Sequence, residues 1–344
     1  MSAPAVSAVM AVHNGMPHVE ASVRSVLAQS FHDFEFVIGD DGSSDGSSDV
    51  LRALAAQDRR IRLLRRETKS GLAASANWVV GEARAPLVAI VHADDIAYPE
   101  RLARQHALFQ AQPGTSLVAT LSDGIDEEGR TVRPADWWRL LSGAPLAPFV
   151  HSSIMFRRAS FDRVGGYRAA AEYWEDLDLY LRLAETGRLL VVPEVLTGVR
   201  HTGISTRLRE RQEEVEDAVD LMYRAIDAYA RGEDYDAVLR AGRAGGRLHP
   251  KTFVARGSTR LWSGRRPGQM RRLLKRGDLR PDAASLQALG WVGWGAVSPR
   301  SLRFVVRAIL RARNALARRS LGACAFVEWH PRGGARPGSA AGRL

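Results

Sequence analysis

The first 95 residues alternate between short apolar runs and stretches whose apolar residues have helical spacing. The apolar runs cover 6–12, 34–39, 61–66 and 85–95, and the stretches with helical spacing cover 18–30, 48–57 and 72–83. This alternation predicts an α/β fold with a mostly parallel, doubly wound sheet that carries helices on both faces. Ligands of such sheets bind beyond the carboxyl ends of the strands.

Polar segments stand where three of these strands end. They are HNG (13–15), DDGSSDG (40–46) and HADD (92–95). Because the ends of parallel strands meet at one edge, we expect one crevice to hold His13, Asn14, Asp41, Asp94 and Asp95. DDGSSDG by itself is also typical of a turn followed by a helix cap, and that alternative stays open.

Clustered carboxylates repel one another unless a cation or a hydrogen-bond donor lies between them. Oxygen ligands suit Mg²⁺ or Mn²⁺, and Mg²⁺ typically completes its coordination with phosphate oxygens and water. The implied ligand is therefore a nucleoside diphosphate with a divalent cation. The sequence contains no GxGxxG after the first strand and no GxxxxGK[ST], which excludes the dinucleotide fingerprint and the P-loop as the phosphate site.

The positive charge of the chain belongs to its second half. Residues 1–205 carry 21 Lys and Arg against 25 Asp and Glu, whereas residues 206–344 carry 28 against 13. This division predicts a catalytic domain over 1–205 and a basic helical region over 206–330. The segment PRGGARPGSAAGRL (331–344) is typical of a disordered tail.

The sequence shows neither a pattern for secretion nor one for a membrane-spanning helix. The chain has one cysteine, Cys324, so an intramolecular disulfide and a cysteine-based zinc site are excluded. The first 15 residues lack a basic start and a long apolar stretch, and no window reaches the roughly 18 apolar residues of a spanning helix. We expect a cytoplasmic protein.

Several segments, in this order and spacing, resemble the family 2 glycosyltransferases over roughly residues 5–206. They are VSAVMAVHNG, SVRSVLAQSFHDFEFVIGDDGSSDGS, SGLAASAN, LVAIVHADDIAYPERLARQ, HSSIMFRR, FDRVGGY, EYWEDLDLYLRL and VPEVLTGVRHTGIST. The resemblance implies a GT-A fold and an inverting enzyme. Such an enzyme moves a sugar from a nucleotide donor, here expected to be a UDP-sugar, to a hydroxyl of a saccharide or lipid-linked acceptor in bacterial surface polysaccharide or glycolipid synthesis.

The resemblance also implies roles for individual residues on the donor side. Asp41 matches the residue that hydrogen-bonds the nucleotide base, and Ala11 and His13 match positions that line it, although the family commonly has tyrosine at the position of His13. Asp94 matches a contact to the ribose or the donor. Asp95 matches the ligand of the Mg²⁺ or Mn²⁺ ion that bridges the diphosphate.

Two segments depart from the family pattern. The common Asp-x-Asp-Asp reads His92, Ala93, Asp94, Asp95 here, so the number of metal ligands differs from the pattern. Many members have arginine before the asparagine that matches Asn77, and here that position is Ala76. We expect Asn77 in the donor site and Lys69 in place of the missing phosphate contact.

Inversion by direct displacement requires a group that takes the acceptor proton. The segment EYWEDLDLYLRL offers Glu172, Glu175, Asp176 and Asp178. The resemblance assigns the role of the base to Asp176, with Glu175 beside it. The alternative is an ordinary helix start, because acidic residues in a first turn offset the helix dipole.

Other residues have weaker claims to the site. His151 lines the site in one interpretation and serves packing in the other. His201 resembles a histidine that reaches the metal or the diphosphate, although here it directly follows Arg200. Trp174, like Trp137 and Trp138, either stacks on an acceptor sugar or packs in the core.

The basic region contains two segments with helical spacing. Residues 207–231 predict an amphipathic helix against the catalytic domain. Residues 301–319 place apolar residues on one face and Arg303, Arg307, Arg311 and Arg318 on another, which is typical of a helix on an anionic membrane. We therefore expect either a peripheral membrane contact through residues 300–319 or a helix docked on its own domain.

Two other functions are compatible with parts of the sequence. A nucleotidyltransferase that makes nucleotide sugars also places carboxylates around a metal, but it normally has a glycine-rich triphosphate loop, which HNGMPH (13–18) lacks. A nucleic-acid-binding protein with a non-catalytic domain would use the basic C-terminal half, and its binding would depend on salt. We expect no nucleic-acid partner.

Overall fold

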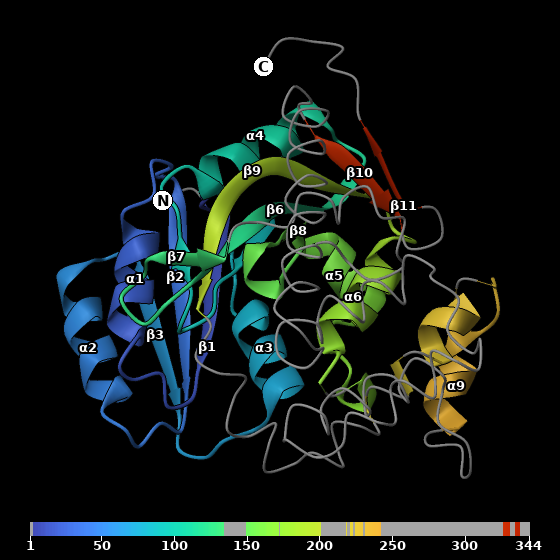
Figure 1. The fold of residues 1–344 in the computed structure, drawn as a ribbon. Helices are drawn as coiled ribbons and strands as arrows, with labels where there is room; N and C mark the ends of the chain where they lie inside the picture. The colour runs from blue at the N-terminus through green and yellow to red at the C-terminus, as the bar shows by residue number, and fades with distance from the viewer. Residues whose placement is uncertain are drawn as a thin grey trace, which may run out of the picture.

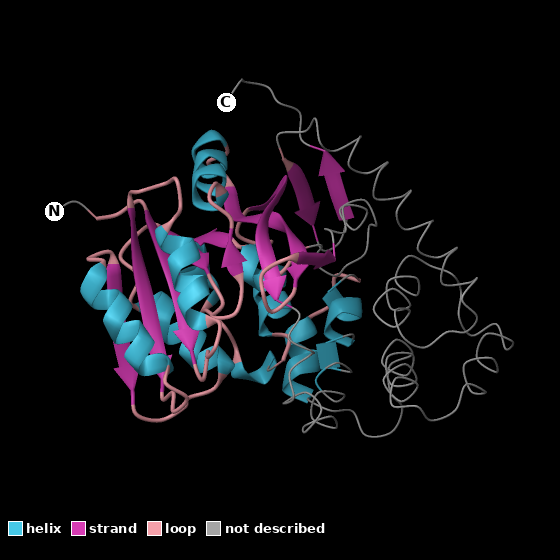
Figure 2. Cartoon of the chain, turned by 60° about the vertical axis from the view of Figure 1, so that its left-hand side comes forward, coloured by secondary structure: helices cyan, strands magenta, loops and turns pink. Residues whose placement is uncertain are grey.

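The computed structural model describes most of the first 200 residues and parts of the remainder. The described residues are 3–133, 149–171, 173–200, 218, 221–222, 224–229, 231–241, 326–330 and 334–337. Figure 1 shows their arrangement, and Figure 2 distinguishes the strands from the helices that pack on them.

Four parallel strands form the first half of the sheet. They are β1 (Val6–Val12), β2 (Phe34–Asp41), β3 (Ile61–Arg66) and β4 (Leu87–Ile90), in the spatial order β4-β1-β2-β3. Both faces of these strands are buried, because the side chains of β1 alternate between two apolar clusters: Val9 joins one, and Ala8 and Met10 join the other.

Helices cover the two faces of this half. On one face α1 (Val19–Leu27) and α2 (Ser47–Gln57) pack over Ala8 and Met10, and on the other α3 (Leu72–Gly81) packs over Val9. In Figure 1, α1 and α2 lie on one side of β1–β3 and α3 lies on the other. The predicted doubly wound arrangement is confirmed for these elements.

The second half of the sheet is mixed. β8 (Met155–Arg157) lies antiparallel between β4 and β6 (Thr115–Ile125), and β6 then pairs in parallel with the long β9 (Arg188–Arg200). Two short strands extend it, since β5 (Ile96–Ala97) pairs with β9 and β7 (Thr131–Arg133) pairs with β6. The helices of this half are α4 (Arg101–Ala111), α5 (Arg158–Val164) and α6 (Glu175–Leu183).

The C-terminal part adds both helix and strand. α9 (Tyr235–Ala241) is helical, and the described residues 224–229 also lie in a helix whose Ile226 and Tyr229 are buried in the core. β10 (Val327–His330) and β11 (Gly334–Pro337) form an antiparallel pair that extends the sheet next to β9, in red in Figure 1.

The C-terminal strands correct one expectation. The expected tail over 331–344 is wrong for Gly334–Pro337, which gains backbone hydrogen bonds by pairing with β10, and the region 206–330 is not entirely helical because it contains β10. The division of the chain at residue 205 stays a prediction. Among the described residues, no helix combines the length and the apolar character that crossing a membrane requires.

Candidate active site

The loops after β1 and β2 are joined by hydrogen bonds at the carboxyl edge of the sheet. The Asn14 backbone N–H donates to Ser43 Oγ at 3.0 Å, and the Ser44 N–H donates to Asn14 Oδ1 at 2.9 Å. His13 Nδ1 lies 2.9 Å from the carbonyl oxygen of Asp41. The structure thus brings together His13, Asn14 and Asp41, three residues that the sequence expected to meet.

The two carboxylates at the end of β2 have different surroundings. Asp40 accepts hydrogen bonds from the Ser43 N–H and the Ser48 hydroxyl, so it stabilises the turn and the start of α2. The turn interpretation of DDGSSDG therefore holds for Asp40. Asp41 instead faces the start of α3 and the segment before it, where the hydroxyl of Ser75 in α3 and the N–H and hydroxyl of Ser70 before α3 donate to it.

Hydrogen bonds keep Asp41 ionised although it is buried. Burial alone would raise the pKa of Asp41, but donation by Ser75 and Ser70 and the charge of Arg66 outweigh burial and lower it. A buried carboxylate at the edge of the sheet is suited to accept an N–H from a ligand. Its contact with a nucleotide base stays a prediction.

The loop after β4 gathers possible metal ligands. His92, Asp94 and Asp95 each offer one ligand atom, and these three atoms lie within 4.8 Å of one another. His92 Nδ1 is 3.5 Å from Asp95 Oδ2. Two carboxylates and an imidazole form a donor set that fits a divalent cation such as Mn²⁺.

The pKa values of the two carboxylates in this loop are shifted in opposite directions. Burial and the neighbouring Asp95 raise the pKa of Asp94. Burial would also raise the pKa of Asp95, but His92 and the backbone N–H of Arg200 outweigh it and hold that pKa below its ordinary value. Asp95 is therefore the carboxylate that stays ionised to the lower pH.

Two buried arginines support this loop, and the sequence interpretation assigned no role to either. The Arg200 N–H donates to Asp95 Oδ1 and its Nε donates to the Asp94 carbonyl, both at 2.9 Å. Arg101 donates to the carbonyls of Ile90 and Ile154, and burial lowers its pKa to about 10. The position of Arg101 as the third residue of PERLARQ gave no signal of this role, because arginine is usually exposed.

A chain of hydrogen bonds leads from His92, in the loop after β4, into the core. His92 Nε2 lies 2.9 Å from His151 Nδ1, and His151 Nε2 lies 2.7 Å from the Tyr167 hydroxyl. Burial and the nearby His92 hold the pKa of His151 well below its ordinary value, so this imidazole is neutral. His151 thus contacts the loop that carries Asp94 and Asp95 through His92, and its lining of the site stays a prediction.

Asn77 fixes the backbone at the end of this chain. Its Nδ2 donates to the Tyr167 carbonyl and its Oδ1 accepts the Tyr167 N–H, both at 2.8 Å. Gly166 has to be a glycine here, because a Cβ would lie 2.5 Å from Asn77 Oδ1. The direct contact of Asn77 with a donor stays a prediction.

Asp176 lies in the first turn of α6, close to the metal loop. Its Oδ1 accepts the Leu177 N–H at 2.7 Å. Burial raises the pKa of Asp176, and the charge of His92 acts in the opposite direction, while Asp176 in turn raises the pKa of His92. The predicted base and the predicted metal site are therefore electrostatic neighbours.

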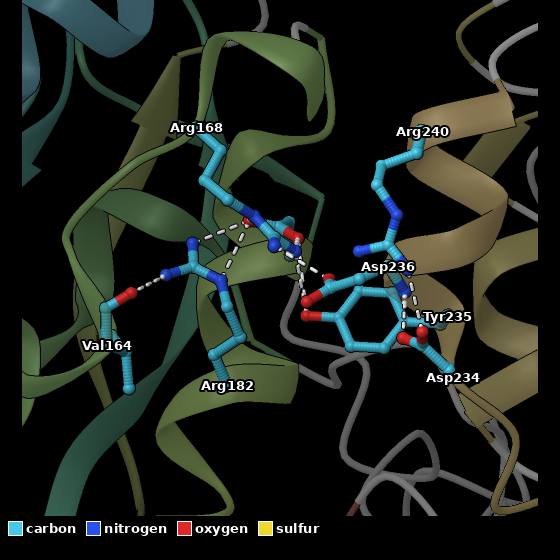
Figure 3. A network of polar contacts seen from close by, with 8 residues as sticks. Val164, Arg168, Arg182, Asp234, Tyr235, Asp236 and Arg240 are labelled. Carbon is cyan, nitrogen blue, oxygen red and sulfur yellow. Dashed lines mark hydrogen bonds and ion pairs between the residues drawn. The ribbon is translucent and has the colours of Figure 1, made fainter.

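A polar network holds the helix that carries Asp176 (Figure 3). Asp178 is fully buried and accepts hydrogen bonds from Arg168 and Arg182. Arg168 also pairs with Asp236 of α9 at 2.7 Å. Because two guanidinium groups neutralise Asp178, it is poorly suited to act as a base, and its role is to fix α6.

The remaining expected residues are scattered. Ala11 is half-buried on β1 opposite Gly39, Lys69 is exposed, Glu175 is half-buried beside Asp176, and Trp174 is only 3% exposed in the apolar core. That burial favours the packing interpretation of Trp174. Four candidates lie outside the described residues: Trp137, Trp138, Glu172 and His201.

Comparisons with known proteins agree with this geometry. The family model described as Glycosyl transferase family 2 matches residues 7–165. EpsE of Bacillus subtilis (strain 168), whose name assigns it to the glycosyltransferases, is 32% identical over 235 residues, which cover 65% of this chain and 82% of EpsE. The chain belongs to the family 2 glycosyltransferases. It is therefore an enzyme of the glycosyltransferase class.

Two other similar proteins extend the comparison. The O-antigen biosynthesis protein RfbC of Myxococcus xanthus is 30% identical over 187 residues, which are 53% of this chain but only 14% of RfbC. The solved mannosyltransferase PcManGT from Pyrobaculum calidifontis, in complex with GDP-Man and Mn²⁺, has a TM-score of 0.51 and 17% identity. The match covers 92% of this chain and 85% of that structure. The expected GT-A fold of this family 2 glycosyltransferase is thus confirmed.

Proposed function

We propose that this glycosyltransferase transfers a sugar, with inversion, from a UDP-sugar to a hydroxyl of a saccharide or lipid-linked acceptor. The observation that carries the proposal is the place of Asp176 in the first turn of α6, where its charge acts on His92 of the loop that also carries Asp94 and Asp95. A base beside a diphosphate site is the arrangement that a direct displacement needs. The name of RfbC, an O-antigen biosynthesis protein, supports surface polysaccharide synthesis as the setting.

The residues divide into a donor side and an acceptor side. Asp41, His13 and Asn14 bind the nucleoside, while Asp94 and Asp95 lie where the diphosphate binds with Mg²⁺ or Mn²⁺. A bound divalent cation neutralises the charge that develops on the leaving diphosphate. The mannosyltransferase neighbour contains GDP-Man and Mn²⁺, which supports a nucleotide sugar and a metal for this fold.

Asp176 takes part in a single displacement. The acceptor oxygen forms a bond to the anomeric carbon as the bond from that carbon to the diphosphate oxygen breaks. The acceptor proton passes to a carboxylate oxygen of Asp176, and the nucleoside diphosphate leaves with the bonding electron pair. A raised pKa makes Asp176 a stronger base than an exposed aspartate, provided that it is ionised.

Calorimetry with UDP tests the donor side directly. We expect UDP to bind with Mn²⁺ present and to bind far more weakly in EDTA, because clustered carboxylates repel a diphosphate that has no cation. Asp95→Asn should weaken the metal-dependent part of UDP binding, whereas Asp41→Asn should change the preference of the site among nucleoside diphosphates. Equal UDP affinity with and without EDTA would contradict the metal assignment.

We also propose that residues 300–319 place the enzyme on an anionic membrane at the cytoplasmic face, near a lipid-linked acceptor. Replacing Arg303, Arg307 and Arg311 with Gln should reduce sedimentation with anionic liposomes and leave UDP affinity unchanged. These substitutions are preferable to truncation, which would remove β10 and β11 from the sheet. Failure of the wild type to sediment at low salt would reject the membrane contact.

A further inference from the structure

We propose that His92 is itself a metal ligand, and that the imidazole shifts the preference of the site from Mg²⁺ toward Mn²⁺ and similar transition-metal ions. The inference rests on the proposed function, because it assigns a ligand to the cation of that site. His92 occupies the first position of the segment HADD, where the sequence has no carboxylate.

The ring of His92 is placed and exposed as a ligand has to be. Its Nδ1 is 3.5 Å from Asp95 Oδ2, and metal bonds of about 2.1 Å place neighbouring ligand atoms roughly 3 Å apart. The side chain of His92 is 42% exposed, whereas that of Asp95 is 5% exposed. His92 is therefore not a packed core histidine, and its ring is open to a ligand from solvent.

The other ring nitrogen of His92 has the partner that a metal-binding histidine needs. The assignment of protons that suits ligation has His92 Nε2–H donating to His151 Nδ1 and His151 Nε2–H donating to the Tyr167 hydroxyl oxygen. In this tautomer His92 Nδ1 carries a lone pair for a cation shared with Asp95, whereas the opposite tautomer donates Nδ1–H to Asp95. Outer partners of this kind fix the tautomer and orientation of a metal-binding imidazole.

The anchoring of Tyr167 makes the chain rigid. Tyr167 is 3% exposed, its backbone is held by both ends of the Asn77 amide, and its ring packs edge-on against Phe161. The orientation of His92 is thus set by residues from three separate parts of the chain. A surface histidine with no function would gain little from such support.

The chemistry of the ligands gives the direction of selectivity. Mg²⁺ strongly prefers oxygen ligands, whereas Mn²⁺, which begins the Irving–Williams order of transition-metal ions, accepts an imidazole nitrogen more readily. With His92, the loop offers two carboxylates and one nitrogen. The nitrogen ligand is the difference that disfavours Mg²⁺ relative to Mn²⁺.

Pulsed EPR on the full-length protein with Mn²⁺ and UDP tests the assignment without any activity measurement. We expect a ¹⁴N coupling in the wild type that disappears in His92→Ala. Metal titrations should show at least tenfold weaker Mn²⁺ binding for His92→Ala, and His92→Asp should shift the ratio of Mn²⁺ to Mg²⁺ affinity toward Mg²⁺. Tyr167→Phe, which retains the ring, should weaken Mn²⁺ binding about tenfold if it orients His92.

The controls separate this inference from the proposed function. His32→Ala, at an exposed histidine before β2, should leave the ¹⁴N coupling and both affinities unchanged, and thermal melts without metal should show that every variant folds. Metal-dependent UDP binding with a ¹⁴N coupling that persists in His92→Ala, or with none in the wild type, overturns the inference alone. UDP binding that is independent of metal overturns both.

Discussion

Asp176 is the residue on which the proposed chemistry depends most. We expect Asp176→Asn to keep metal-dependent UDP-sugar binding and to lose about 100- to 10,000-fold in transfer rate, because the amide cannot take the acceptor proton. Glu175→Gln, one position earlier on α6, should cost much less. Steady-state rates with the matching acceptor would decide, and an Asp176→Asn variant that retains more than about a tenth of the wild-type rate would contradict the assignment.

The raised pKa of Asp176 predicts the acid side of the pH profile. Below its pKa the carboxyl is protonated and cannot accept a proton, so the rate should increase with pH through that pKa. Because burial raises the pKa of Asp176, the midpoint of this increase should lie above the ordinary aspartate value of 3.8. The profile of kcat should be measured alongside UDP binding at each pH. If UDP binding is constant over this pH range and the midpoint of the kcat profile lies at or below 3.8, Asp176 is not the group that sets the profile.

The residues of the site were partly predictable from the sequence. His13, Asn14 and Asp41 meet because parallel strands end at one edge, which is a property of the pattern itself. The chain from His92 through His151 to Tyr167 was not predictable in this way, because it joins segments 59 and 16 residues apart. No spacing rule links the loop after β4 to the turn that precedes β8 or to the segment between α5 and α6.

The turn after β2 offers a comparison between two glycines with positive φ. A Cβ on Gly42 (φ 74°) would lie 3.1 Å from the Glu67 oxygen and from the Lys69 nitrogen, whereas one on Gly46 (φ 95°) would meet nothing within 4 Å. Each change to alanine costs about 1–2 kcal/mol for the left-handed backbone. Gly42→Ala should cost more in unfolding free energy than Gly46→Ala because of the additional contact.

The two glycine substitutions should also differ in their effect on the proposed nucleotide site. Ser70, which donates two hydrogen bonds to Asp41, directly follows the segment that a Cβ on Gly42 would displace. We therefore expect Gly42→Ala to weaken UDP binding and Gly46→Ala to leave it close to wild type. Equal losses of stability and of UDP affinity in the two variants would show that the close approach of residues 67–69 is unimportant.

Local pattern predicted the strands and helices of the first half well. The run 6–12 is β1 and the run 61–66 is β3, residue for residue. The run 85–95 was too long, because β4 ends at Ile90 and the following residues turn to form the loop that carries His92, Asp94 and Asp95. The insertion of β8 between β4 and β6 followed from no local signal, since it pairs strands that are distant in the sequence.

The ion pairs that connect α6, which carries Asp176, with α9 can be compared by their contributions to the free energy of unfolding. Asp178→Asn removes the buried carboxylate that pairs with both Arg168 and Arg182 and should cost about 3–5 kcal/mol, as for other broken buried ion pairs. Asp236→Asn removes an ion pair whose carboxylate is 45% exposed and should cost about 0–1 kcal/mol. Denaturation by urea would compare them, and losses of similar size would contradict the importance of burial at Asp178.

The pairing of β10 with β9 has a consequence for synthesis of the chain on the ribosome. Residues 189–191 of β9 pair with residues 327–329, so this part of the strand is made long before its neighbour emerges. Until then, a nascent chain presents backbone N–H and C=O groups that can pair with other chains. We expect early termination upstream of Val327 to yield a product that aggregates or recruits chaperones, even though it contains every residue of the proposed catalytic site.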